Sequence, residues 1–345
     1  MAGAWVQFAL EEAPNAEDGS NNVSSNVFYL KADSVKFDDG FVPLEEKGKM
    51  VGALGRARHL GTAKFEPKLS VKGIFPRPAD LGLLLYAWSG DCTSTPGAGG
   101  VTDPDAAAVP AGATKHVFAF AEDTPQTLRI TCKDAGGKYW RLTGGGLENI
   151  TFAFGTDGVL SCDLDIIGLF GGEIANPSLT PSYDAATPFR QGDMTLEWLT
   201  DSAVTKGFDF ALKAGLETDK GFSVVSDYPD TIQFQNDEES LPDVSGTIDK
   251  RTVKTEDLDA LHDGEQFAAQ IKLTHREDIG VTGRKSAAWI EMPGCQHISF
   301  DPDDIKNVRR RESKWGWQAR VDEATDTLAT ITVVNGTAAY ATYGA

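Results

Sequence analysis

The chain has 345 residues and is 41% hydrophobic, so it can bury sizeable cores, and its length predicts about two domains. Its 51 acidic residues against 32 lysines and arginines give a net charge of −19, which argues against a protein that grips nucleic acid through a basic face. With 4 cysteines and no CxxC spacing, a disulfide scaffold is also disfavoured, and reduced thiols in a cytosolic compartment are expected. No apolar run approaches the ~20 residues that span a bilayer, so no membrane partner is expected.

Short strands are predicted in the first part of the chain, where valine, phenylalanine and leucine cluster or alternate with polar residues: 5–10, 26–30, 34–37 and 64–72. Residues 38–63 form a long segment between two of these strands. Its positive charge lies at its C-terminal end, on Arg56, Arg58 and His59. An ordered loop of that length in a compact domain usually has a function, and disorder in the free protein is the alternative.

A short helix is predicted over residues 78–88, with Pro78 in its first turn and Asp80 near the positive end of the helix dipole. Residues 93–114, rich in glycine, proline, alanine and threonine, are typical of an exposed flexible loop. Further strands are predicted after this loop: 127–131, 139–142, 149–154 and 159–167.

The second half shows the same order of elements without the flexible insertion. A helix over residues 254–262, capped by Thr255, is followed by four predicted strands: 269–273, 287–291, 297–300 and 315–321. Prolines and small polar residues before this half suit an extended linker. We therefore expect a first domain over residues 1–180, a linker over 181–193 and a second domain over 194–345.

Three short matches occur in the same order in both halves: 33–37 with 230–234, 68–84 with 244–261, and 146–152 with 294–300. Matches in register predict a duplicated β-rich unit. Because side chains alternate along a strand, we expect Ile150 and Phe152 to match Ile298 and Phe300 on a buried strand face. Two such units in one chain can occupy two similar positions of a ring, which directs attention to assembly.

No pattern of catalytic residues is evident. The five histidines lack metal-ligand spacing, and the glycine runs lack the form of phosphate-binding loops, so no catalytic, cofactor or metal site is expected, and no enzyme. Asp163 and Asp165 lie at strand spacing, where a solvated sheet face is a commoner role than acid/base chemistry. The densest positive run comprises Arg309, Arg310 and Arg311; it is either a solvated hairpin tip or a contact with an acidic face of a neighbouring subunit.

With these features the sequence resembles the major tail tube proteins of long-tailed, siphovirus-like bacteriophages. The resemblance is strongest over residues 127–198, where 158–172 and 188–198 look like a strand end and the linker of such proteins. Residues 321–343, with Ile-Thr-Val-Val-Asn at 331–335, are similar to their closing strand.

The resemblance implies a mainly β protein of two tandem tail-tube-like sandwich or barrel units, each with one short flanking helix. In that fold a sheet of each subunit joins a closed barrel around a channel, and a long loop reaches the adjacent ring. Residues 38–63 hold the place of that loop. Its basic residues Arg56, Arg58 and His59 are therefore expected to contact an acidic surface of the adjacent ring. The corresponding segment of the second half, taken as residues 235–240, is short, so this half either lacks the inter-ring contact or makes it elsewhere.

The implied function is that of a virion structural protein of the tail, assembled in the host cytoplasm without a cofactor. Its partners would be other copies of itself and tail proteins such as the tape measure and terminator. DNA would pass through the lumen without specific binding, because an acidic wall repels phosphates. Two-domain subunits filling six positions imply rings of three chains with pseudo-sixfold symmetry, and rings of six chains are the alternative.

Two other classes of protein remain open. A carbohydrate-binding β-sandwich module, of a phage or a secreted protein, would expose aromatic side chains on one sheet face, and the 7 tryptophans are the candidates for such a platform. A glycosidase-like enzyme would need two carboxylates at a fixed separation.

Overall fold

The structure is a computed structural model that describes residues 4–12, 23–45, 59–97, 99–120, 125–154, 158–199, 201–202, 205–218, 232–234, 242–250, 255–280, 283–302, 313–322 and 327–340. The described part of the chain is mainly β, as the sequence predicts, with antiparallel strand pairing throughout. Its two α-helices begin at the predicted positions: α1 (Pro78–Ser89) and α2 (Thr255–Asp263). No helix in these ranges is long and apolar enough to cross a membrane.

The strands of the first half are β1 (Ala4–Glu11), β2 (Val23–Ala32), β3 (Ser34–Asp38), β4 (Phe41–Glu45), β5 (His59–Phe65), β6 (Lys68–Ile74), β7 (Gly90–Pro96), β8 (Thr114–Phe120), β9 (Leu128–Lys133), β10 (Tyr139–Phe154), β11 (Leu160–Ile167) and β12 (Phe170–Ile174). Those of the second half are β13 (Met194–Trp198), β14 (Asp201–Ser202), β15 (Thr205–Lys213), β16 (Leu216–Thr218), β17 (Ile232–Phe234), β18 (Asp243–Lys250), β19 (Phe267–Asp278), β20 (Lys285–Pro302), β21 (Ser313–Arg320) and β22 (Thr330–Asn335). A single 3-10 turn, Gln191–Asp193, precedes β13.

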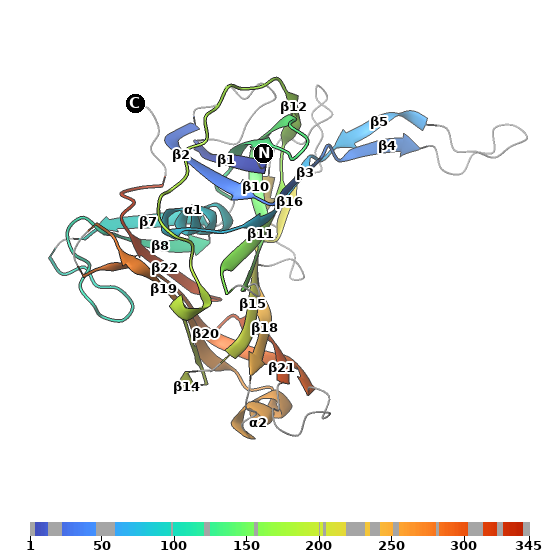
Figure 1. Ribbon diagram of the computed structural model, residues 1–345. Coiled ribbons are helices and arrows are strands. Elements are labelled where there is room, and N and C mark those ends of the chain that lie inside the picture. The colour runs from blue at the N-terminus through green and yellow to red at the C-terminus, as the bar shows by residue number, and fades with distance from the viewer. Residues whose placement is uncertain are drawn as a thin grey trace, which may run out of the picture.

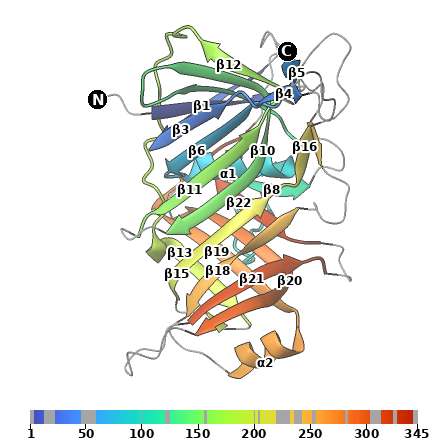
Figure 2. The same cartoon turned by 90° about the vertical axis from the view of Figure 1, so that its right-hand side faces the viewer.

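Eight of these strands form one continuous sheet that crosses both halves of the chain, which we call the inner sheet. Its order is β3-β6-β11-β10-β15-β18-β21-β20. Figure 2 faces this sheet and shows its tilted strands following one another from β3 near the top to β20 and β21 at the bottom. The two halves are therefore joined edge to edge, through β10 and β15, rather than connected by the linker alone.

Two long strands pass from the inner sheet into outer sheets. The first part of β10 pairs with β9 and β12, and its last part pairs with β11 and β15. In the same way, β20 pairs first with β19 and β22 and then with β21. Two separate strands were expected in each of these places, and that expectation was wrong because each strand continues unbroken from one sheet into the other.

Gly144 marks the bend in β10. Its φ is +58°, and a Cβ at this position would lie 2.6 Å from Leu169 Cδ1, so only glycine fits. The bend leaves the Gly144 N–H outside the ladder, and this group donates to Glu11 Oε2 at 2.9 Å. A buried carboxyl group on β1 thus holds the point where β10 changes sheet.

The order of strand pairing in the first half recurs in the second. The series β2-β1-β9-β10-β12 and β10-β11-β6-β3 has its counterpart in β14-β13-β19-β20-β22 and β20-β21-β18-β15. The helix follows β6 in one half and β18 in the other. Each half also has a hairpin at the same point: β4 and β5 lie between β3 and β6, and β16 and β17 lie between β15 and β18.

The position of the second hairpin corrects one sequence match. Residues 232–234 form β17, which pairs with β16, whereas residues 34–38 form β3, which pairs with β6. The strand that holds the place of β3 in the second half is β15, so the match of 33–37 with 230–234 was wrong. A five-residue alternation of polar and apolar residues recurs in many strands and cannot identify one. The long segment of the second half is therefore 214–242; residues 235–240 themselves lie outside the described ranges.

The burial expected for the third match holds for only part of it. Ile150 is 0% exposed and Phe152 is 1% exposed, as predicted. Phe300 is half-buried and packs against the core. Ile298 is 52% exposed, so the expectation that it lies on a buried face was wrong.

A β-bulge explains the exposure of Ile298. The pairing of β20 with β21 shifts between His297 and Ser299, which makes Ile298 the extra residue of the bulge. In β10 the pairing with β11 shifts at Glu148, which comes before Ile150, whereas in β20 the shift comes after His297. As a result, the place of Ile150 is taken by His297, whose side chain is buried.

Much of the segment 93–114 is exposed, as its composition predicts, but the segment is not an irregular loop throughout. It contains the end of β7 and the start of β8, and β8 pairs with β22 of the second half. At the tip of this hairpin, Val109 packs in a small cluster with Trp289, and Asp103 forms an ion pair with Arg284. The insertion thus connects the two halves. Glycine, proline and alanine allow its tight turns, and only long-range contacts determine that it is ordered.

The core is continuous across the two halves and encloses α1. Leu83, Leu84 and Leu85 are each at most 1% exposed, and nearly every residue of the helix is buried. A helix that is apolar on all sides belongs in the interior. Figure 1 shows α1 in the middle of the molecule, among the strands, and α2 at the far end of the second half. The first helix is therefore central, and the expected flanking position was wrong for it.

Candidate assembly interface

The inner sheet ends in two strands that each have one open edge. Among the pairings of the described residues, β3 pairs with β6 alone, and residues 296–302 of β20 pair with β21 alone. The two end strands do not pair with each other, so the sheet is an open, curved wall. Backbone N–H and C=O groups along such edges are a template for a strand of another chain.

The junction between β10 and β15 shows how such an edge is filled inside the chain. On its buried side, Ile150 lies opposite Leu212 and Phe152 lies opposite Phe210, with the two phenyl rings stacked at 4.7 Å. All four side chains are at most 2% exposed. This internal junction is a five-residue antiparallel pairing that buries a continuous apolar layer.

The two strands with open edges correspond to the two strands of the internal junction: β20 corresponds to β10, and β3 corresponds to β15. The strand β15 pairs with β18 as β3 pairs with β6, and β10 pairs with β11 as β20 pairs with β21. β10 has β15 as its neighbour, whereas its counterpart β20 has no strand at the corresponding edge among the described residues. In the same way, β15 has β10 as its neighbour, whereas its counterpart β3 has no strand at the corresponding edge among the described residues.

The exposed face of the inner sheet is polar and bounds a hollow of about 840 Å3 that extends over both halves. By the pairing register, the charged side chains on this polar face are Lys36, Lys68, Lys72, Lys213, Lys314, Arg320, Asp38, Asp163, Asp165, Asp209, Asp243, Asp249 and Asp301. Glu148 also lines the hollow, so eight acidic groups stand against six basic ones, which is close to balance. The acidic excess of the chain is therefore not concentrated on this face.

Hydrogen bonds across strands hold the carboxylates of the polar face. Asp165 accepts from Ser70 Oγ at 3.0 Å and from Asn149 Nδ2 at 3.3 Å. Asp163 accepts from the Gly73 N–H at 2.9 Å. Each carboxylate thus links neighbouring strands, which is the role of a solvated sheet face and not that of an acid/base pair aimed at a substrate.

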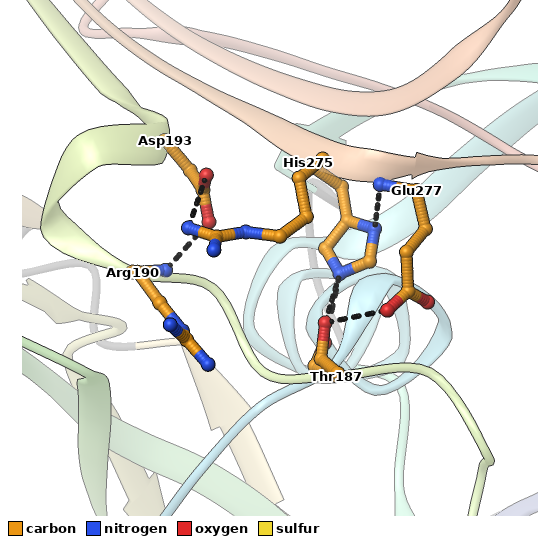
Figure 3. A network of polar contacts seen from close by, with 6 residues as sticks. Thr187, Arg190, Asp193, His275 and Glu277 are labelled. Atoms are coloured by element: carbon orange, nitrogen blue, oxygen red, sulfur yellow. Dashed lines mark hydrogen bonds and ion pairs between the residues drawn. The ribbon is translucent and has the colours of Figure 1, made fainter.

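Two contacts fix the linker against β19, and Figure 3 shows them together. His275 Nδ1 accepts the Glu277 N–H at 3.2 Å, so Nε2 carries the proton and donates to the Thr187 carbonyl oxygen at 2.8 Å. The Thr187 hydroxyl donates to Glu277 Oε1 at 2.9 Å. No spacing in the sequence connects these residues, because they meet only through the tertiary fold.

The second contact of the linker centres on Asp193. Its carboxylate accepts a hydrogen bond from the Arg190 backbone N–H at 2.8 Å and another from a guanidinium N–H of Arg276 at 3.0 Å (Figure 3). The first bond closes the 3-10 turn, and the second ties that turn to β19. The linker is also tied to the first half, since the Leu160 N–H of β11 donates to the Phe189 carbonyl oxygen at 2.9 Å. Together with the internal junction, these contacts fix the angle between the two halves, which a subunit needs if repeated steps are to close into a ring.

Most of the basic residues predicted to make inter-subunit contacts lie outside the described ranges: Arg56, Arg58, Arg309, Arg310 and Arg311. His59 is the first residue of β5. The hairpin of β4 and β5, to which His59 belongs, projects from the body of the molecule in Figure 1.

Two buried carboxyl groups have strongly altered acidity. Burial raises the pKa of Glu11 to about 7 and the pKa of Asp80 to about 7. Glu11 lies at the bend of β10, and Asp80 accepts the Arg77 N–H at 3.2 Å at the start of α1. Both positions are structural, since each carboxyl group accepts a backbone N–H that has no other place in a ladder or helix.

The tryptophans do not form an exposed platform for a sugar. Six of the seven are at most 5% exposed: Trp5, Trp88, Trp198, Trp289, Trp315 and Trp317. The remaining one, Trp140, is stacked on Phe37 at 4.9 Å. The feature expected of a carbohydrate-binding module is thus missing from this set of residues.

The features that bear on function are geometric: two open edges of matching geometry, a polar curved face and a fixed angle between the halves. Comparison of the sequence with protein-family models found no matching family, and comparison with curated proteins found no significant match.

Proposed function

We propose that this chain is a structural subunit that assembles head to tail into rings, which stack into a tube like that of the phage tail proteins that its sequence resembles. One observation carries the proposal: the internal junction of β10 and β15 is a complete example of a contact whose two halves are otherwise open, on β20 and β3. Adding β3 of a second copy to β20 repeats that contact between chains. The contact is heterologous, so repetition produces a ring or a helix.

The recurrent pairing order supports the expected organisation into two tandem units, residues 1–180 and 194–345, joined by the linker 181–193. Each unit supplies four strands to the inner sheet. If both units make the same step around an axis, six steps close a ring of three chains with pseudo-sixfold symmetry. A ring of six chains would require a smaller step.

In such a ring the polar face lines the channel. A wall with balanced charges, whose carboxylates are engaged in cross-strand hydrogen bonds, offers no basic track for phosphates. DNA would therefore pass without binding tightly. The proposal places the protein in the virion tail, after assembly in the host cytoplasm, with the tape measure and terminator proteins as further partners.

Electron microscopy of the purified protein tests the proposed function. We expect rings or stacked tubes, with a ring mass of three chains of 37.0 kDa each by native mass spectrometry. A protein that stays monomeric at all concentrations would contradict the assembly function. A mass of six chains would retain the tube and reject the three-chain ring.

Changing Arg56 and Arg58 to glutamate tests the axial contact. These residues lie between β4 and β5 in the sequence, outside the described ranges, and their charge opposes that of the rest of the chain. One exposed ion pair contributes only ~0.2–1 kcal/mol, but repetition around a ring multiplies the effect. We expect the variant to form rings that do not stack, as seen by electron microscopy.

A matched control carries the same two changes at Lys138 and Lys285, which are exposed on the body of the molecule. It should form tubes like those of the unchanged protein. Tubes of normal length from the Arg56/Arg58 variant at physiological salt would show that this segment does not make the axial contact.

A further inference from the structure

We infer that the contact between copies is a charge-matched strand pairing in one defined register, which salt weakens while the internal junction stays closed. We call this contact the seam; it consists of β3 of one copy and residues 296–302 of β20 of another. The inference rests on the proposed function and goes beyond it, because it specifies which residues meet and what controls ring closure.

The register of the seam follows from positions that match across the two halves. We lay the two halves on each other with Ser70 of β6 on Ser245 of β18, which places the buried Leu69 on the buried Val244. The pairings through β11 and β21 then put Gln296 in the place of Asn149. When β3 is laid on β15, Asp38 takes the place of Lys213. Asn149 pairs with Lys213, so Gln296 of one copy lies opposite Asp38 of the next. The rest of the register is His297 opposite Phe37, Ser299 opposite Lys36, Phe300 opposite Val35, and Asp301 opposite Ser34.

This register brings opposite charges together on the polar face. Lys36 lies diagonally across from Asp301, within the reach of a long side chain. Arg320 donates its Nε–H to Gln296 Oε1 at 3.2 Å, so its guanidinium lies beside the place that Asp38 of the next copy takes. A shift by one residue would send the polar residues of β3 toward the core, so the alternation of β3 specifies the same register.

The internal junction has no such ion pairs. The places of Lys36 and Asp301 are taken there by Ala211 and Ala153, and the place of Arg320 is taken by Ile167. The charges are therefore specific to the edges that meet another copy. Opposite charges across an interface specify the register and increase the rate of encounter, and salt screens them.

The apolar side of the seam is also less complete than that of the internal junction. There the pairs are Ile150 with Leu212 and Phe152 with Phe210, whereas the seam pairs a buried histidine with Phe37 and a half-buried Phe300 with Val35. A smaller apolar layer leaves a larger share of the free energy of association to the charges. Raising the salt concentration should thus open the ring at the seam without unfolding the chain.

Charge exchange tests the ion pairs. Lys36→Glu and Asp301→Lys should each weaken ring formation by about tenfold or more in mass photometry at low salt, because each removes an attraction and adds a repulsion. The double variant should restore it. Lys285→Glu, an exposed change at the far end of β20, should assemble normally. Raising the salt from about 0.05 M to about 0.5 M should dissociate the unchanged rings into folded monomers.

Cysteine pairs test the register. Ser299→Cys combined with Lys36→Cys should give disulfide-linked chains up to the size of the ring, whereas Ser299→Cys combined with Ser34→Cys should not. Two results would overturn this inference and leave the tube function standing. One is ring formation that salt and the charge changes do not affect; the other is cross-linking only of the Ser299→Cys and Ser34→Cys pair. A chain that never assembles would remove the proposed function and the inference with it.

Discussion

Replacing Asp103 with asparagine should lower the free energy of unfolding by about 3–5 kcal/mol. The side chain of Asp103 is 2% exposed, and that of Arg284, its ion-pair partner, is 16% exposed. The amide keeps the shape and can still accept the Ala107 N–H, but it leaves a buried guanidinium without an opposite charge. Chemical denaturation at neutral pH measures the loss.

Asp105→Asn provides the matched control. Asp105 lies two residues away on the same tip and pairs with Lys272, where both side chains are more exposed, at 37% and 28%. A solvent-exposed pair of this kind contributes about 0–1 kcal/mol, so the control should unfold nearly like the unchanged protein. Equal effects of the two changes would show that the insertion does not dock on the second half through Asp103.

The second large effect concerns pH. Because the pKa of Glu11 is raised from 4.5 to about 7 in the folded chain, the folded state holds a proton that the unfolded chain releases. The stability due to this proton is complete below pH 4.5 and is lost as the pH rises through 7. The loss amounts to about 3 kcal/mol. Asp80, raised from 3.8 to about 7, has the same sign and a similar size.

Glu11→Gln should remove this loss, because the neutral amide can accept the Gly144 N–H at every pH. We expect the variant to match the unchanged protein near pH 4 and to exceed its stability by about 3 kcal/mol near pH 8. Denaturant titrations at both pH values measure the difference. Glu12→Gln, a change at the exposed neighbour, should run parallel to the unchanged protein. If Glu11→Gln also runs parallel, the Glu11 carboxyl group is ionised in the fold.

Elements with local signals could be predicted from the sequence. Pro78 and Thr255 place the starts of the two helices, because the groups that begin a helix lie within one turn of it. The class of fold followed from short alternating runs and frequent glycines. The burial of Ile150 and Phe152 followed from the same alternation.

Features that depend on distant partners were decided by the tertiary structure. A glycine run can end a strand or bend it, and the packing of Leu169 and the carboxyl group of Glu11 determine that β10 bends. A single extra residue in β20 turned Ile298 outward, since a bulge changes the side of every following side chain relative to the sequence pattern.

The sequence by itself determined the β class and the starts of the two helices, because these depend on residue types and near neighbours. The tertiary structure alone decided which strands meet: the internal junction of β10 with β15, the docking of residues 93–114 and the two open edges. Strand pairing joins residues far apart in the chain through backbone groups that every residue carries. No residue pattern specifies such a partner; only the three-dimensional arrangement of the whole chain does.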